Sequence, residues 1–244
     1  NILFTNNDSA YETAISLNQK GINVDAVIDN REEVESKLIR DTENSNIKVY
    51  KGYAVVDTSG YKRINKVSIM QLSKDGQKVI GSKISINCDC LGISGGWTPA
   101  VHLFTQSGGK LKFREEDQVF IPNIHPSDQL SIGACNGDFT LDEILSNIPD
   151  KLKEFLNIKK TDYENLEVYS SFNKSKRNIW LLPSDKVIGK TKPFVDYQND
   201  ATAKDIKLAL REGFRSIEHV KRYTTTGMGT DQGKLGNMHA LGII

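Results

Sequence analysis

The chain has 244 residues, enough to bury one large core or two smaller ones. Its 32 Lys and Arg side chains nearly balance 31 Asp and Glu side chains, and this net charge of +1 argues against bulk attraction to nucleic acid or an anionic membrane. No apolar run approaches the roughly 20 residues that cross a bilayer, and the first residues lack the features of a signal peptide. We therefore expect a soluble protein with no nucleic-acid or membrane partner.

Three cysteines, Cys88, Cys90 and Cys135, are too few and too unevenly spaced for a disulfide framework, which favours the cytoplasm. Cys88 and Cys90 have no second pair at metal-site spacing, so we interpret them as buried structural residues and predict no metal site. The four histidines are scattered, and no residue is assigned a catalytic role. The chain begins without Met and stops without a polar tail, which we interpret as an internal fragment.

The first forty residues predict the opening of a Rossmann-type unit, in which parallel strands alternate with helices. The expected elements are a strand at 2–4, a helix from Ala10 to Lys20, a strand at 24–28 and a helix at 32–40. In such a unit, an acidic residue at the end of the second strand binds ribose hydroxyls, and Asp29 occupies that position. Arg31 is compatible with a 2′-phosphate, but Asp29 beside it favours NAD over NADP.

The first turn of the predicted unit is the candidate site for the pyrophosphate, because a helix N-terminus presents free N–H groups there. Its residues are Thr5, Asn6, Asn7, Asp8 and Ser9. Both leading glycines of the usual Gly-x-Gly-x-x-Gly pattern are missing, and Asp8 has the wrong charge for a phosphate. Asn tolerates unusual backbone angles, and Asp8 or Ser9 can cap the helix. A degenerate unit kept only for structure therefore remains an equal alternative.

Short strands follow from residue 47, with turn residues between them. The expected strands are 47–50, 53–56, 64–72 and 78–86, and the expected turns are 58–60 and 74–76. A β-meander after a βαβ half is the layout of disulfide-reductase-like flavoproteins. The run 88–99, which contains Gly95 and Gly96, resembles the signature by which those chains return to a flavin-side domain.

The middle of the chain is less regular. We expect a loop over 120–130, a strand ending in small residues within 130–139 that lies near a cofactor, a helix at 141–145 and a polar connector over 158–177. Nearer the C-terminus, Thr202 is expected to cap a helix over 203–212, closed by Gly213, and a second helix starts at Ser216.

The C-terminal segment resembles a small two-iron ferredoxin-like module found in amine and amino-acid dehydrogenase subunits. Its four cysteine positions fall on Asp196, Gln198, Asp231 and Gly236. None of these residues can hold a cluster through sulfur. The resemblance therefore implies a module that keeps the helical fold without the metal.

Three segments, 5–11, 95–99 and 218–234, together resemble the alpha subunit of heterotetrameric sarcosine oxidases, and the resemblance extends over nearly the whole chain. It departs at Leu235-Gly236, where Thr-Ser is expected. It implies an α/β fold of disulfide-reductase-like flavoprotein architecture plus the small helical domain. The implied domains are 1–95 (Rossmann-like, with the meander), 96–150 (part of a flavin-type domain), 151–190 (connector) and 191–244 (helical module).

The resemblance also implies cofactors and partners. NAD would bind this subunit, FMN would lie at the boundary with a beta subunit, and FAD and tetrahydrofolate would lie elsewhere in a complex with beta, gamma and delta subunits. The fragment alone would be inactive. The residues that we assign to the FMN side are Lys221, Arg222, Thr224 and Thr225, which offer charge-assisted donors. An exposed helix end is the alternative, since Lys and Arg also favour the helix dipole there.

Three other hypotheses compete. A related FAD-linked opine, proline or amino-acid dehydrogenase subunit commonly keeps the cluster cysteines, which this chain lacks. A non-catalytic flavoprotein scaffold with an empty Rossmann site accounts for the missing glycines. A free-standing disulfide reductase conflicts with the absent redox cysteine pair.

Overall fold

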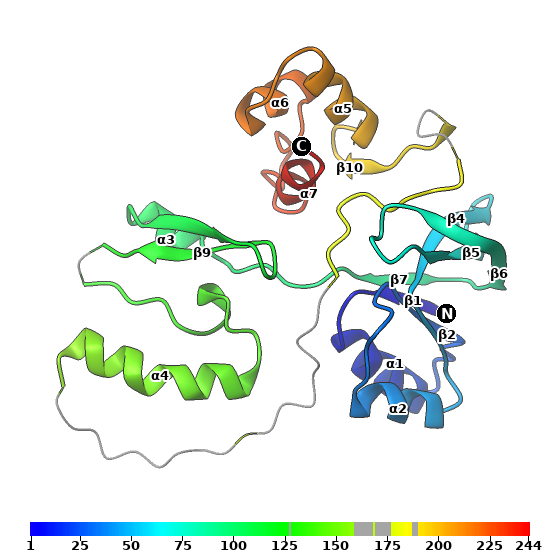
Figure 1. The fold of residues 1–244 in the computed structure, drawn as a ribbon, viewed down its shortest axis with the longest axis horizontal. Coiled ribbons are helices and arrows are strands. Elements are labelled where there is room, and N and C mark those ends of the chain that lie inside the picture. The colour runs from blue at the N-terminus through cyan, green and yellow to red at the C-terminus, as the bar shows by residue number, and fades with distance from the viewer. Residues whose placement is uncertain (127, 159–167, 169–176, 187–189) are drawn as a thin grey trace. The chain divides into compact units, whose positions relative to one another are not determined.

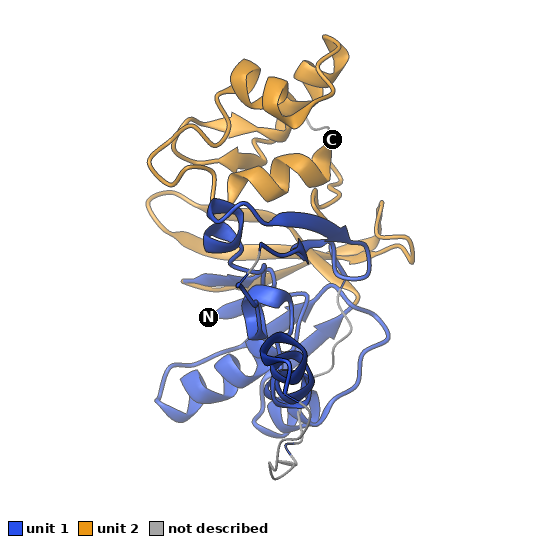
Figure 2. Cartoon of the chain, turned by 90° about the vertical axis from the view of Figure 1, so that its left-hand side faces the viewer, with its two compact units in different colours: residues 1–51, 90–178 blue, residues 52–89, 179–244 orange. Residues whose placement is uncertain are grey.

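The computed structural model describes residues 1–126, 128–158, 168, 177–186 and 190–244 (Figure 1). The chain divides into two compact units, residues 1–51 with 90–178 and residues 52–89 with 179–244 (Figure 2). Each unit is thus built from two separate stretches of sequence. Most of the predicted connector over 158–177 lies outside the described residues, and the predicted domain boundaries stay predictions.

The first unit contains a four-stranded parallel sheet in the order β3-β2-β1-β7. Its elements are β1 (Ile2–Thr5), α1 (Ser9–Gln19), β2 (Ala26–Asp29), α2 (Lys37–Asn44), β3 (Lys48–Lys51) and β7 (Leu91–Ser94). β1 pairs with β2 on one side and with β7 on the other. The α/β class with a parallel sheet is therefore confirmed. Residues 47–50, predicted together with the strands of the meander, instead supply β3, because Val49 pairs with Val27 of β2.

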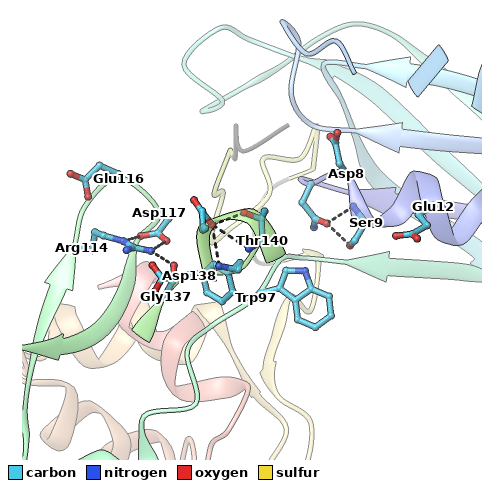
Figure 3. Close-up of a pocket in the computed structure, with 13 residues that line it drawn as sticks. Asp8, Ser9, Glu12, Trp97, Arg114, Glu116, Asp117, Gly137, Asp138 and Thr140 are labelled. Atoms are coloured by element: carbon cyan, nitrogen blue, oxygen red, sulfur yellow. Dashed lines mark hydrogen bonds and ion pairs between the residues drawn. The ribbon is translucent and has the colours of Figure 1, made fainter. Parts of the chain in front are cut away.

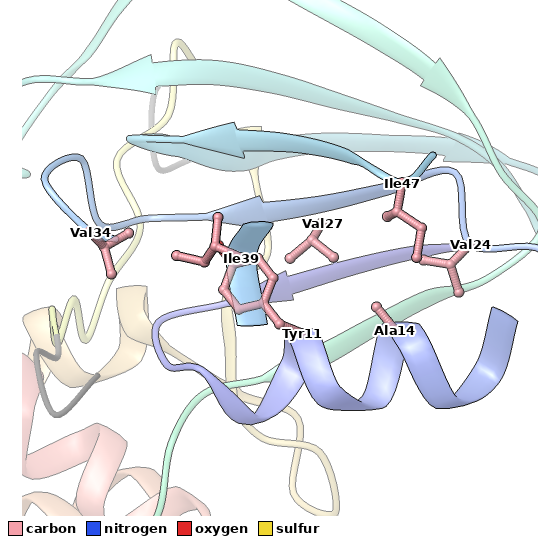
Figure 4. Packing of buried hydrophobic residues seen from close by; sticks show 7 residues of the cluster. All are labelled: Tyr11, Ala14, Val24, Val27, Val34, Ile39 and Ile47. Atoms are coloured by element: carbon pink, nitrogen blue, oxygen red, sulfur yellow. The ribbon is translucent and has the colours of Figure 1, made fainter. Parts of the chain in front are cut away.

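An apolar cluster between the two helices and the sheet holds this unit together (Figure 4). Its members are Tyr11, Ala14, Val24, Val27, Val34, Ile39 and Ile47, each at most 2% exposed. The prediction that the second helix begins at residue 32 is wrong. Val34 packs into the cluster instead, and the Ser36 hydroxyl accepts the backbone N–H of Ile39 at 3.3 Å, so that α2 begins at Lys37.

The remainder of the first unit consists of α3 (His102–Gln106), β8 (Lys110–Arg114), β9 (Val119–Ile124), the 3-10 helix η1 (Gly133–Asn136) and α4 (Leu141–Leu156). The loop predicted over 120–130 is wrong in its first half, because β8 and β9 form an antiparallel hairpin. Pro122 is tolerated there because each strand of a two-stranded sheet keeps one free edge. The strand predicted within 130–139 is also wrong, since its small residues form η1.

The second unit contains the predicted β-meander, β4 (Tyr53–Gly60), β5 (Ile64–Leu72) and β6 (Val79–Asn87), as a three-stranded antiparallel sheet. The turn expected at 58–60 lies slightly later, because β4 continues to Gly60. Ala54, Val67, Ile69 and Leu72 are buried in this sheet.

A small helical part completes the second unit. It consists of β10 (Phe194–Asp196), β11 (Ala201–Thr202), α5 (Ala203–Arg211), α6 (Ile217–Thr224) and α7 (Gly236–Ile243). Its core contains Val195, Ile206 and Val220. Thr202 is the N-cap of α5, as predicted, and its backbone N–H and its hydroxyl both donate to the Asp205 carboxylate, at 2.8 and 2.7 Å. Likeness to a two-iron ferredoxin-like module stays a prediction. Among the described residues, none of the helices combines the length and apolar character that crossing a membrane requires.

Candidate functional site

The turn between β1 and α1 is held by side-chain hydrogen bonds in place of the missing glycines. The Thr5 hydroxyl accepts the backbone N–H of Asn7 at 3.1 Å and donates to its carbonyl at 2.9 Å. The Asn7 side-chain oxygen accepts the backbone N–H of Ser9 at 3.1 Å. Asp8 precedes α1 with a helical backbone and makes no capping hydrogen bond. The expectation that Asp8 or Ser9 caps this helix is therefore wrong, since Asn7 supplies the acceptor.

The same turn is tied to the segment that follows β7. The Asn7 amide donates to the carbonyl of Ser94 at 3.2 Å. Gly96 has φ +101, a backbone conformation that favours glycine, and a Cβ there would lie 3.4 Å from the Asn6 side-chain oxygen. A Cβ at Gly95 would meet open space. The structure thus brings Gly96 beside the predicted turn residues.

Beneath the turn, Arg31 joins two carboxylates in the interior. Its Nη2 lies 2.7 Å from Asp8 Oδ1 and 2.7 Å from Asp29 Oδ2, and its Nε donates to Asp29 Oδ1 at 3.0 Å. Tyr11 donates its hydroxyl to Asp29 Oδ2 at 2.8 Å. Asp29 is 0% exposed, Arg31 3% and Asp8 2%. The carboxylate predicted to bind ribose is therefore engaged by the protein itself.

Two pKa values reflect this network. Burial raises the pKa of Tyr11, and the adjacent Asp29 carboxylate raises it further. For Arg31, burial alone would lower the pKa, but the hydrogen bonds and charges of Asp29 and Asp8 outweigh burial and raise it. Both groups accordingly keep their protons over the physiological range.

A cavity of about 630 Å³ opens beside the turn (Figure 3). It is lined by the start of α1, by Trp97, by the β8–β9 turn and by the residues that precede α4. Its charged lining residues are Asp8, Glu12, Arg114, Glu116, Asp117, Asp138 and Glu143. Arg114 pairs with Asp117 at 2.5 Å, and Lys151 reaches Asp138 at 3.2 Å. Carboxylates therefore outnumber cations on the wall of this cavity.

These residues do not fit the pyrophosphate of a dinucleotide in the conformation described. Two backbone N–H groups of the turn, those of Asn7 and Ser9, are already accepted by side chains. The adjoining wall is predominantly acidic and would repel a phosphate. Asn30, which the sequence did not single out, follows β2, and its buried side-chain oxygen has no hydrogen-bond partner among the described residues. That atom can accept a hydrogen bond from a ligand hydroxyl or a water.

The four residues assigned to the FMN side belong to the second unit, at the C-terminal end of α6. The Thr224 hydroxyl donates to the carbonyl of Val220 at 2.8 Å, and the Thr225 hydroxyl to that of Thr224 at 2.6 Å. Arg222 is exposed and lies 4.0 Å from Glu218. A helix C-terminus carries partial negative charge, which attracts Lys221 and Arg222 but disfavours a phosphate. Their cofactor role stays a prediction.

Two of the four positions that align with cluster cysteines, Asp196 and Gln198, make hydrogen bonds within the protein. The Asp196 carboxylate accepts the backbone N–H groups of Gly227 at 2.7 Å and Gln198 at 2.8 Å. The Gln198 side-chain oxygen accepts the N–H and hydroxyl of Thr230 at 2.6 and 2.8 Å. These two side chains connect β10 to the loop after α6, a role that sequence reasoning missed.

The cysteine prediction is half wrong. Cys88 is buried, but Cys90 is exposed, and both cysteines follow the end of β6 at Asn87. The described part of the chain contains no group of His, Cys, Asp and Glu suited to hold a metal ion.

Comparison with known proteins relates the chain to one family. Residues 190–244 match a family model described as the sarcosine oxidase A3 domain. The whole chain is 32% identical to sarcosine oxidase subunit alpha of Corynebacterium sp. (strain P-1), of which it covers 25%. The chain is similar in sequence to sarcosine oxidase alpha subunits. The subunit alpha of Rhizobium meliloti (strain 1021) is 30% identical over 99% of the chain, which covers 23% of that protein.

The resemblance inferred from the motifs is thus confirmed, and the chain spans about a quarter of the length of these alpha-subunit relatives. Solved structures are more distant. Thioredoxin reductase of T. acidophilum is 19% identical at a TM-score of 0.38, over 56% of this chain and 48% of that one. L-proline dehydrogenase from P. horikoshii is 13% identical at a TM-score of 0.37, over 99% and 73%.

Proposed function

We propose that this chain is part of the alpha-type subunit of a sarcosine oxidase, an oxidoreductase complex that acts on the CH–NH bond of sarcosine and yields glycine, hydrogen peroxide and a one-carbon product. The observation that carries the proposal is the 30–32% identity along the chain to proteins named sarcosine oxidase subunit alpha. Chemistry would reside on other parts of the complex, and this chain alone would be inactive.

The same relationship supports finer proposals about the assembly. Beta, gamma and delta subunits would be its partners in the cytoplasm, FMN would lie at the boundary with beta, and FAD and tetrahydrofolate would lie elsewhere. Co-expression of the intact protein with those subunits, followed by an assay of sarcosine-dependent peroxide formation, tests this proposal. A complex that assembles and oxidises a different amine would instead favour a related dehydrogenase-type subunit.

The βαβ unit, which consists of β1, α1, β2, α2 and β3, has two candidate roles in the protein. NAD binding is supported by the strand-turn-helix order, by the position of Asp29 and by the adjoining cavity. A scaffold closed to nucleotide is supported by the ion pairs of Arg31 with Asp8 and Asp29 and by the acidic wall. We favour the scaffold, because NAD would have to open a buried network before Asp29 could reach a ribose.

Calorimetric titration of NAD and NADP into the intact protein separates these two explanations. If the unit is a scaffold, neither NAD nor NADP should give a saturable heat of binding to it. Ser94→Asp adds a charge beside Asn7, and Ser59→Asp adds one on the exposed end of β4. NAD binding that is weakened by the first variant and unchanged by the second would establish the dinucleotide site. Asp29 and Arg31 are unsuitable for this test because their loss disturbs the core.

A further inference from the structure

A second cavity, of about 690 Å³, lies within the second unit and has a different character from the first. Four stretches line it: β4, the turn between β5 and β6, the residues on either side of 187–189, and α5. Half-buried apolar side chains, among them Val55, Leu182 and Pro193, form part of its wall. A cavity of this volume is in the range that accommodates a nucleotide-sized molecule.

Four lysines surround this cavity, Lys186, Lys190, Lys192 and Lys207. Asp57 is the acidic residue of its lining, and its carboxylate lies 2.6 Å from Lys186 Nζ. Lys190, Lys192 and Lys207 are exposed, and none forms an ion pair with another described residue. Three positive charges are therefore left uncompensated around one concave surface.

The combination of lysines and apolar side chains around this cavity indicates the class of ligand. Ammonium groups attract a phosphate dianion as point charges, and the apolar wall offers area to a less polar body. Three of the lysines precede β10 and Lys207 belongs to the helix α5, so their convergence is produced by the fold. We propose that this cavity binds a small phosphorylated organic molecule, with the phosphate between Lys192 and Lys207 and the organic part against the apolar wall.

The alternative is that the lysines are merely solvated and cover apolar surface with their methylene stems. A solvated face would bind phosphorylated and unphosphorylated ligands equally. Substitution of these lysines would then have the same effect as substitution of another lysine on the same helix. Lys204 provides the matched comparison, because it is exposed, belongs to α5 and does not line the cavity.

The test is calorimetric titration of AMP, adenosine and inorganic phosphate into the intact protein at low salt. AMP is expected to bind, adenosine to bind at least about tenfold more weakly, and added salt to weaken AMP binding. The double variant Lys192→Gln/Lys207→Gln should weaken AMP binding about tenfold or more, whereas Lys204→Gln should leave it unchanged. All three positions are exposed, so the variants should fold, which thermal unfolding can verify.

Several results would overturn the proposal. These are the absence of saturable AMP binding, equal binding of AMP and adenosine, and equal weakening by Lys204→Gln. If inorganic phosphate binds as tightly as AMP, the organic part of the ligand contributes nothing and the cavity is a phosphate site only. Because Ser94→Asp alters the other unit, AMP binding that is lost in that variant would assign the ligand to the βαβ unit instead.

Discussion

At the scale of single residues, Arg31 is the cation on which the interior of the first unit depends. Replacing it with Met would remove the cation that pairs with the buried carboxylates of Asp8 and Asp29. We expect the free energy of unfolding to fall by about 3–5 kcal/mol, the cost of an uncompensated buried charge. Urea denaturation, combined with hydrogen exchange in β1 and β2, measures the loss.

Arg222→Met is the matched control, because Arg222 is exposed and its ion pair with Glu218 is long, at 4.0 Å. Its cost should stay within about 0.5 kcal/mol. Equal stability of the two variants would mean that the Arg31 network contributes nothing to the fold.

The buried carboxylate of Asp196 should make the stability of the second unit depend on pH in the acid range. Burial alone would raise its pKa, but the backbone N–H groups of Gly227, Asn199 and Gln198 outweigh burial and lower it. The ionised side chain therefore contributes stability above the unfolded pKa of about 3.9, and this contribution is lost as the pH falls through the lower folded pKa. Asp196→Asn should cost about 1–3 kcal/mol at neutral pH, with a smaller difference from the parent protein in acid.

Urea denaturation of the second unit over a pH series measures this difference. Glu212→Gln, at the exposed C-terminal end of α5, is the control and should leave the acid dependence unchanged. A constant gap between Asp196→Asn and the parent protein across the series would contradict the assignment.

At the scale of elements, the start of α5 depends on one side chain. Asp205→Ala removes both hydrogen bonds from Thr202 and should destabilise the helix by about 1 kcal/mol. Hydrogen exchange of the first turn of α5 should accelerate accordingly. Lys204→Ala changes the neighbouring exposed position without touching the cap, and it should leave exchange unchanged or slower.

The elements also show where sequence patterns suffice. Thr202 before an apolar stripe predicts α5, and alternating apolar residues predict β5, because both signals are local. The pairing of β3 with β2 is set by the fold, and no local pattern contains it. The hairpin of β8 and β9 is local, but Pro122 within it argues against a strand. At the candidate site, the sequence placed Asp29 at the end of β2 but could not reveal that Arg31 and Tyr11 engage its carboxylate.

At the scale of the whole molecule, each unit has its own buried cluster. Ile39→Ala in the first cluster and Ile206→Ala in the second should each cost about 2–5 kcal/mol, because each leaves a cavity in a closely packed core. We expect each substitution to accelerate hydrogen exchange chiefly in the segments of its own unit, measured by mass spectrometry of peptides. Uniform acceleration over both units in either variant would contradict a division into two cores.

The position of β7 has a consequence for synthesis on the ribosome. β1 is central in its sheet, yet its neighbour β7 ends at Ser94, after the whole meander, whereas β3 ends at Lys51. At about 5–20 residues per second, translation takes roughly 2 to 9 seconds to cover that interval. During this time the nascent chain exposes one unpaired edge of β1, a template for pairing with other chains. Slower translation of the meander should therefore increase the demand for chaperones that bind emerging strands.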